Sequence, residues 1–126
     1  MNITDLAMVN DTQKRMKGKP VIVAINATNP MVMSEFEKQS SAILMHFGVQ
    51  DQALLDIISG AGEPTGLLPM QMPANMGTVE KQFEDVPLDM ECYVDAPGNK
   101  YDFGFGMNWK GVIKDDRVAK YKVPVK

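Results

Sequence analysis

The stretch that decides the fold of this chain reads Gly60-Ala61-Gly62-Glu63-Pro64-Thr65-Gly66-Leu67-Leu68-Pro69-Met70-Gln71-Met72-Pro73. Its three glycines and Pro64 end the apolar helical pattern that precedes them, and Pro69 and Pro73 exclude a helix afterwards. The residue before each proline is pushed toward extended backbone. The composition therefore predicts an irregular, extended segment that lies over a core.

Upstream of this stretch the sequence has three helical patterns. Helices are expected over residues 5–17, 34–39 and 51–59. Thr4 is expected to be the N-cap of the first helix, and Gly18 is expected to end it. Phe36 is expected to face the sheet from the short second helix. Asp51 is expected to be the N-cap of the third.

Two apolar runs between these helices predict parallel β-strands over residues 21–26 and 42–47. The first run is rich in β-branched residues and apolar at successive positions, so we expect both faces of its strand to be covered. Strands that alternate with helices imply right-handed crossovers and an α/β fold. The sequence offers only these two convincing strands, which leaves sheet edges with unpaired backbone groups.

Beyond the glycine- and proline-rich stretch, regularity fades. One or two helical turns are expected over residues 78–83, and the alternating residues 88–94 predict a half-exposed edge strand. Residues 101–109 then bring aromatic and glycine residues together. We divide the chain into one domain over residues 1–113 and a charged tail over residues 114–126, and we expect residues 110–126 to be loosely attached.

Length and composition limit the classes of function. The 126 residues suffice for one domain with a modest core, and the eleven methionines are interpreted as soft core filling. A net charge of −3 with mixed signs predicts no nucleic-acid partner and no membrane partner. The N-terminus has no signal-peptide pattern, and the single cysteine excludes an internal disulfide.

No constellation in the sequence predicts a catalytic, cofactor-binding or metal site. The glycines of residues 60–66 follow a helix instead of a strand, so a phosphate loop is not expected. His46 lies in an apolar strand and is interpreted as a buried, hydrogen-bonded histidine; with Cys92 it does not make a metal-ligand set. Cys92 has no base near it in sequence. The acidic residues from which a carboxylate pair could come are Glu35, Glu37, Asp51, Asp56, Glu63, Glu84 and Asp85, and the sequence singles out no pair among them.

Two motifs lie about thirty residues apart in the chain. The first is Gly62-x-Pro64-x-Gly66-x-Leu68-Pro69-x-x-x-Pro73, and the second is Tyr101-x-Phe103-Gly104-x-Gly106. Together they resemble the C-terminal α/β domain of glycoside hydrolase family 3, the β-glucosidase and β-xylosidase family, and residues 5–113 are similar to that domain throughout. The resemblance implies an α/β fold, a partial three-layer α/β/α sandwich of flavodoxin-like topology with a short parallel sheet and an irregular C-terminal segment.

In this family the aspartate nucleophile lies in an N-terminal barrel, which has no counterpart in this chain. The resemblance therefore implies a structural or accessory piece that is inactive alone, whose partners are the missing barrel and the upstream part of the α/β domain. Whole enzymes of the family hydrolyse terminal β-glycosidic bonds with retention. The matching residues are glycines, prolines and aromatics, so no catalytic residue is transferred. Many members carry Pro-Gly-x-Glu-Gly-Gly after the second strand, where this chain has residues 47–52 without that pattern.

A complete domain of this kind has about six strands. The resemblance thus implies that the chain begins partway through its sheet, and we expect the exposed edge to drive homo-oligomerisation. An alternative is a free-standing α/β ligand-binding module that uses the strand ends near residues 26–30 and 47–50. Five or more strands in order would favour that alternative. A third possibility is an independent hydrolase with its own carboxylate pair.

Overall fold

The structure is a computed structural model that describes residues 3–83 and 85–121. Its elements in chain order are α1 (Ile3–Arg15), β1 (Ile22–Asn26), the 3-10 turns η1 (Met33–Glu35) and η2 (Glu37–Gln39), β2 (Ala42–His46), α2 (Asp51–Ser59), α3 (Met76–Lys81), β3 (Met107–Asn108), β4 (Gly111–Val112) and α4 (Asp116–Tyr121). β1 and β2 form a parallel sheet, and β3 and β4 pair as a short antiparallel hairpin. The predicted mixed α/β fold with a short parallel sheet is confirmed.

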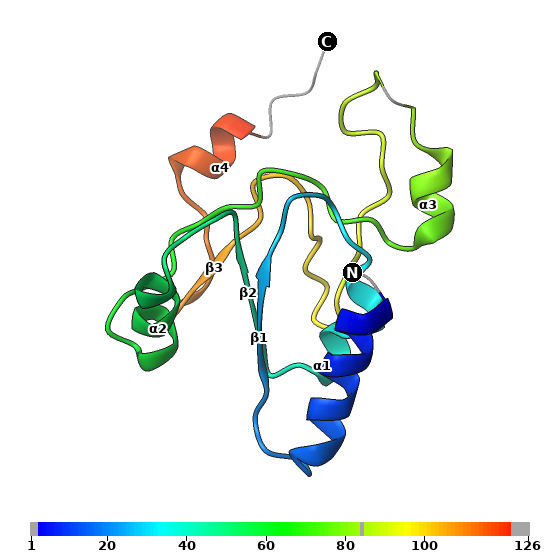
Figure 1. Cartoon of the computed structure of the whole chain (residues 1–126). Helices are drawn as coiled ribbons and strands as arrows, with labels where there is room; N and C mark the ends of the chain where they lie inside the picture. Colours follow the sequence, from blue (N-terminus) through cyan, green and yellow to red (C-terminus); the bar gives the residue numbers. More distant parts are fainter. Residues whose placement is uncertain (1–2, 84, 122–126) are drawn as a thin grey trace.

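The elements are arranged around the parallel sheet. Figure 1 shows this sheet nearly edge-on, with α1 on one side and α2 on the other. Leu6 and Val9 of α1 pack against the core on the first side. The segments that carry α3 and α4 lie beyond the end of the sheet at which β1 finishes (Figure 1). This end of the sheet is therefore the one that the irregular C-terminal half of the chain approaches.

The two faces of β1 differ in burial. Val23 and Ile25 are buried, whereas Ile22, Ala24 and Asn26 are exposed. The buried positions face α1, because they share one core cluster with side chains of that helix. The prediction that both faces of this strand are covered is wrong for the described residues. An apolar run of this kind is also compatible with a strand that has one open face, and the sequence pattern does not separate the two cases.

The core lies between the α1 face of the sheet and the irregular segments. Phe36, in the turn between η1 and η2, is 1% exposed and packs in the same cluster as β1, as predicted. Met33 and Met72 are equally buried in that cluster, which confirms the role of these methionines as core filling. Met8 and Met76 lie largely in solvent, so that interpretation does not extend to them.

Two of the predicted helix caps are wrong. Thr4 lies inside α1 instead of before it. Asp51 is the first residue of α2, and its N-cap is Gln50, which makes no side-chain capping bond. The C-terminal end of α2 agrees with the sequence pattern, because Gly60 ends the helix in the left-handed conformation with a φ of 80°.

The short elements also differ from their predictions in detail. The helix expected over residues 34–39 is two 3-10 turns, and α3 begins two residues before the expected range. Asn75 caps α3, because its side-chain oxygen accepts the Thr78 N–H at 3.0 Å. Among the described residues, no helix has the length and apolar character that a membrane span requires.

Residues 88–94 do not form the predicted edge strand. Leu88 has a φ of 62°, in the left-handed region, which breaks an extended path at the start of the segment. Only isolated bridges remain, between Pro73 and Cys92 and between Val94 and Lys100. Met90, Cys92 and Tyr93 are buried, whereas Leu88 and Val94 are exposed, so burial in this segment does not follow the alternation of apolar and polar residues.

Part of the predicted tail contacts the rest of the chain. Residues 116–121 form α4, and the Arg117 guanidinium donates to the Thr65 carbonyl oxygen at 2.9 Å. The Tyr121 ring meets Phe103 edge-on at a centroid distance of 5.1 Å. Residues 122–126, the rest of the predicted tail, lie outside the described residues.

Candidate functional site

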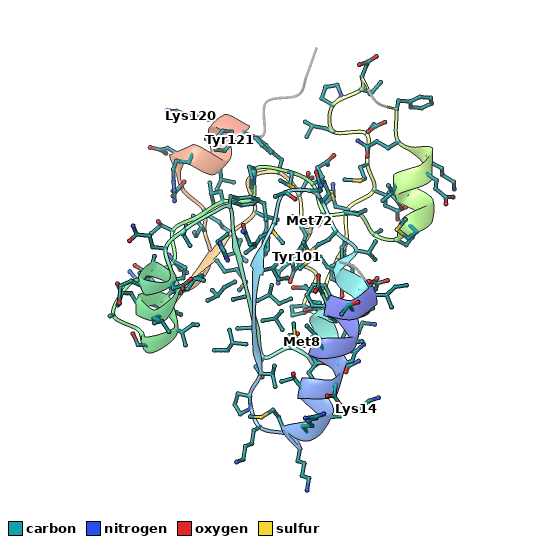
Figure 2. The ribbon with its side chains drawn as sticks, in the orientation of Figure 1. Met8, Lys14, Met72, Tyr101, Lys120 and Tyr121 are labelled. Carbon is teal, nitrogen blue, oxygen red and sulfur yellow. The ribbon has the colours of Figure 1, made fainter. Side chains whose placement is uncertain are left out.

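The two motifs that the sequence singled out lie against each other. The Leu68 N–H donates to the Phe105 carbonyl at 2.7 Å, and the Gly104 N–H donates back to the Leu68 carbonyl at 2.8 Å. Further along the first motif, the Met72 N–H donates to the Tyr101 carbonyl at 2.9 Å. Figure 2 shows Met72 and Tyr101 close together near the middle of the molecule. The motifs therefore form one structural unit, although about thirty residues separate them.

A close approach between the motifs requires glycine at position 106. A Cβ atom placed there would overlap the Gly66 carbonyl oxygen and would come within 3.0 Å of the Leu67 side chain. Gly66 has no such restriction on its own side, since a Cβ there would meet nothing within 4 Å. The last glycine of the second motif is thus explained by the backbone of the first.

A polar cluster joins the motifs to the segment between them. Gln71 donates from Nε2 to Asp102 Oδ1 at 2.6 Å and to Cys92 Sγ at 3.3 Å, and Lys100 pairs with Asp102 at 2.8 Å. Burial alone would raise the pKa of Asp102, but hydrogen bonds from Lys100, Gln71 and the Phe103 N–H outweigh it and lower that pKa. A lowered pKa is the reverse of what a general acid needs. This cluster was missed from the sequence, since its members lie up to 31 residues apart and share no pattern.

Cys92 is a buried thiol in this cluster. Burial, followed by the negative charge of Asp102, raises its pKa from 9.0 to about 11. A nucleophilic cysteine needs the opposite shift, because the thiolate is the reactive form. The geometry agrees with the sequence interpretation that Cys92 is not a nucleophile.

Glu37 is held by a tyrosine. The Tyr93 hydroxyl donates to Glu37 Oε2 at 2.9 Å, and the Tyr93 ring packs edge-on against Tyr101 at 5.4 Å. Burial, then the hydrogen bond to Glu37, raises the pKa of Tyr93 to about 12. This contact ties the turn η2 to the aromatic motif, so the carboxylate has a structural role.

The other acidic residues proposed from the sequence are dispersed. Asp56 accepts a hydrogen bond from Gln52 at 2.8 Å on the exposed side of α2. Asp51 is the first residue of that helix, where its negative charge interacts favourably with the helix dipole. Glu35, Glu63 and Asp85 are exposed, and Glu84 lies outside the described residues. Within the described part of the chain, no group of three or more histidine, cysteine or acidic side chains is placed to hold a metal ion.

The C-terminal ends of β1 and β2 meet at Asn26 and His46. These residues are register partners, and the Ala27 N–H donates to the His46 carbonyl at 2.8 Å. The His46 side chain is half-buried, and its Nδ1 atom is buried with no hydrogen-bond partner among the described residues. The prediction of a hydrogen-bonded buried histidine is wrong at this atom.

A hollow of about 430 Å³ lies beside β1. Met8 and Val9 of α1 line one side of it, residues 23–26 line its length, and residues 28–31 close one end. The strand-end loop at residues 47–50 takes no part in its lining, so the structure does not join the two loops that a free-standing binding module would use. A second hollow of about 210 Å³ lies between the first motif and α4.

Residues 4–109 match the family model described as the glycosyl hydrolase family 3 C-terminal domain. The chain belongs to this family. The match runs through both motifs, and the structure shows why they occur together, since each supplies the hydrogen-bond partners of the other.

Curated relatives agree with this membership. The chain is 35% identical over 105 residues to a probable beta-glucosidase C of Aspergillus flavus and 34% identical over 106 residues to beta-glucosidase C of Emericella nidulans. A periplasmic beta-glucosidase/beta-xylosidase of Dickeya chrysanthemi is 26% identical over 88 residues. The matches cover 79%, 80% and 70% of this chain but only 16%, 16% and 12% of the respective relatives. No solved structure gives a significant match.

Proposed function

We propose that this chain is the non-catalytic C-terminal part of a β-glucosidase-type enzyme, in which it packs on a catalytic barrel and helps to wall the sugar site. The observation that supports this role is the extent of the match, which takes in most of the chain but about 16% of the beta-glucosidase relatives. The contacts of Glu37, Cys92 and Asp102 also favour a scaffold, because each of these groups is engaged in holding segments together.

Retaining glycoside hydrolysis needs two carboxyl groups about 5–5.5 Å apart on either side of the scissile bond. One acts as nucleophile and the other as general acid and then base. We assign neither group, and no cofactor or metal, to this chain. The remainder of the enzyme supplies the pair, and the enzyme releases terminal β-linked sugars with retention of configuration.

Two partners follow from this role. The first is the missing part of the enzyme, namely the barrel and the upstream portion of the α/β domain. The second is another copy of the chain itself, which the isolated piece recruits to cover its exposed sheet edge. Both partners would cover the same edge, so in the whole enzyme the upstream polypeptide excludes the second copy.

The test is hydrolysis of 4-nitrophenyl β-glucoside and β-xyloside by the chain alone, by the protein encoded upstream of it alone, and by the two together. We expect no hydrolysis by the chain alone and hydrolysis by the mixture. A mixture with the Gly106→Ala chain serves as control, since that variant is expected to lose the packing of the two motifs. Hydrolysis by the purified chain alone would contradict the proposal.

The alternative of a free-standing ligand-binding module has one observation in its favour, the hollow of about 430 Å³ beside β1. Among the described residues, however, the parallel sheet has two strands and the only other pairing of strands is the two-residue hairpin. A module of that type needs about five strands to enclose its site. The strand count therefore favours the fragment.

A further inference from the structure

Between its two motifs the chain leaves the body of the molecule and returns, over residues 75–89, which we call the α3 excursion. Backbone contacts close its base, since the Ala74 N–H donates to the Glu91 carbonyl at 2.9 Å and Pro73 bridges to Cys92. Figure 1 shows α3 and the chain that returns from it standing clear of the parallel sheet. Compact surface loops whose ends are held together often carry function.

The helix α3 has its polar side inward. Thr78 is the one buried residue among the described residues of the excursion, and its N–H and hydroxyl both donate to the Asn75 side chain. Met76 and Val79 are one turn apart on the other side of the helix, where both are exposed. A surface helix normally buries its apolar side. The reversed arrangement indicates that a further apolar surface covers α3 in the assembled protein.

The return from α3 extends this apolar surface. Phe83, Val86 and Leu88 are exposed, and Phe83 is the most exposed of them at 70%. The Phe83 N–H donates to Asp89 Oδ2 at 2.9 Å, and the Val86 N–H donates to the Phe83 carbonyl at 3.2 Å, so hydrogen bonds fix the backbone that presents these side chains. Leu88 has a φ of 62°, which is unfavourable for leucine. Backbone strain of this kind is concentrated at functional sites.

The charge of the excursion narrows the class of partner. Residues 75–89 contain four acidic residues and one lysine. This balance repels nucleic acids and anionic lipid surfaces, both of which attract basic segments. The exposed apolar side chains, one of them aromatic, have the composition of the buried centre of a protein–protein interface. The excursion therefore fits a protein surface that has an apolar centre and a basic rim.

The position of the excursion selects that protein. It lies beyond the end of the parallel sheet at which β1 finishes, and α/β sheets bind their ligands at the carboxyl ends of the strands. An eight-stranded α/β barrel has its active site at the carboxyl ends of its own strands. These two faces meet if this chain walls a sugar site in the barrel. The matches cover only 16% of the beta-glucosidase relatives, so the polypeptide that supplies the second face lies outside this chain.

We propose that the α3 excursion is the surface through which this chain docks on the catalytic part of the enzyme, with Phe83 as anchor and Met76, Val79 and Leu88 around it. This inference rests on the proposed function, in which another part of the enzyme carries the catalytic carboxyl groups. A buried aromatic anchor dominates the affinity of such a surface, and the side chains around it exclude water. The two motifs thus hold the chain together, whereas the excursion between them binds the partner.

The first test measures the Kd between this chain and the protein encoded upstream of it by isothermal titration calorimetry. We expect Phe83→Ser to raise the Kd at least about tenfold, because it removes the anchor. Since Phe83 is exposed in the isolated chain, the variant should keep the urea midpoint of the parent. Leu55→Ser is the matched control, because Leu55 is 57% exposed on α2. It should change the Kd by less than about threefold.

The second test uses the parent chain and needs no variant. Brief treatment with hydroxyl radicals oxidises exposed methionine and aromatic side chains, and peptide mass spectrometry gives the rate at each residue. Met76 and Phe83 should be oxidised at least about fivefold more slowly in the complex than in the chain alone, because the partner excludes water from them. Met107, which is exposed on β3, should be oxidised equally in both.

Three results would overturn the inference. Parent-like binding by the Phe83→Ser chain, or an equal loss in the Leu55→Ser chain, would show that Phe83 is no anchor. Unchanged oxidation of Met76 and Phe83 on mixing would place any interface elsewhere. Oxidation that slows as the isolated chain is concentrated would identify a second copy as the occupant.

The same mixtures separate this inference from the proposed function when their hydrolysis of 4-nitrophenyl β-glucoside is measured. Hydrolysis by a mixture in which Met76 and Phe83 stay unprotected would overturn the docking surface and leave the proposed function standing. Protection of both residues without hydrolysis would support the docking surface and contradict the proposed function.

Discussion

At the scale of single residues, Cys92 shows how surroundings set reactivity. Its sequence neighbours gave no reason to expect an activated thiol, and the structure adds the physical cause, burial next to the Asp102 carboxylate. Both effects keep the proton on sulfur. Because the folded state holds this proton more tightly than the unfolded state, the thiol contributes stability that is present below about pH 9 and is lost as the pH rises to about 11.

We predict that Cys92 in the folded chain reacts with iodoacetamide at pH 8 about 100-fold more slowly than in urea, because a pKa of about 11 instead of 9.0 reduces the thiolate fraction by that factor. Mass spectrometry of timed samples gives both rates. A Cys92→Ser background with Ser34→Cys provides an exposed thiol as control, and it should react equally fast in both states. Fast alkylation of native Cys92 would contradict the assignment.

His46 offers a second residue-scale prediction. Its buried Nδ1 has no partner among the described residues, and such a group costs about 1–3 kcal/mol. His46→Leu removes that group and replaces the imidazole with an apolar side chain, so it should raise the free energy of unfolding of the isolated chain by about 1 kcal/mol. Leu44→Ala, on the same face of β2, should lower it by about 1–2 kcal/mol. A urea titration measures both, and a destabilised His46→Leu chain would reveal a partner for the imidazole.

The environment of a single residue could be predicted from the sequence where it depends on a local pattern. Phe36 was expected to face the sheet and is 1% exposed. The hydrogen bonds from Gln71 to Cys92 and Asp102 could not be predicted, because each links residues more than twenty positions apart. The missing hydrogen-bond partner of His46 Nδ1 could not be predicted either, since the expected burial of a side chain does not show whether its polar atoms are hydrogen-bonded.

At the scale of elements, the contact between the two motifs is the feature that organises the C-terminal half. We predict that Gly106→Ala lowers the free energy of unfolding by about 3 kcal/mol or more, because the new Cβ would overlap the Gly66 carbonyl oxygen and both backbones are held by the Leu68 hydrogen bonds. Urea unfolding followed by Trp109 fluorescence gives the change.

The matched control for this prediction is Gly66→Ala, because Gly66 is the other residue of the same close contact. A Cβ on Gly66 meets nothing within 4 Å, and its backbone is not in the left-handed region. Gly66→Ala should therefore change stability by less than about 1 kcal/mol. If the two alanine variants unfold alike, the close approach at Gly106 does not explain the motif.

Elements with strong periodicity were predictable, and those shaped by long-range contacts were not. The bounds of α2 match the expected range, and β1 and β2 each fall within one residue of theirs. Residues 88–94 alternate as a strand would, yet Leu88 is left-handed, Cys92 and Tyr93 are both buried, and only isolated bridges form. The burial of two consecutive residues departs from the period of two that a half-exposed strand has, and the sequence pattern does not reveal this departure.

At the scale of the whole molecule, one small core packs against a sheet of two parallel strands. Val23 and Ile25 are buried on one face, while Ile22 and Ala24 on the other remain in solvent. A doubly wound domain covers both faces of its sheet. The open face and the free edge of β1 therefore both lack the cover that a complete domain of this type gives its strands.

The free edge gives the last prediction. We expect the isolated chain to form dimers whose fraction rises with concentration in sedimentation velocity experiments, since exposed N–H and C=O groups and apolar side chains favour pairing of β1 with the β1 of a second copy. Ala24→Lys should suppress dimers, because two lysines would face each other across such a pair, while Ser34→Lys adds the same charge on an exposed turn away from β1 and should not. The upstream polypeptide should suppress dimers as well, because it occupies the same edge. A monomer at all concentrations would refute self-association, and dimers that persist in the Ala24→Lys chain would move the interface away from β1.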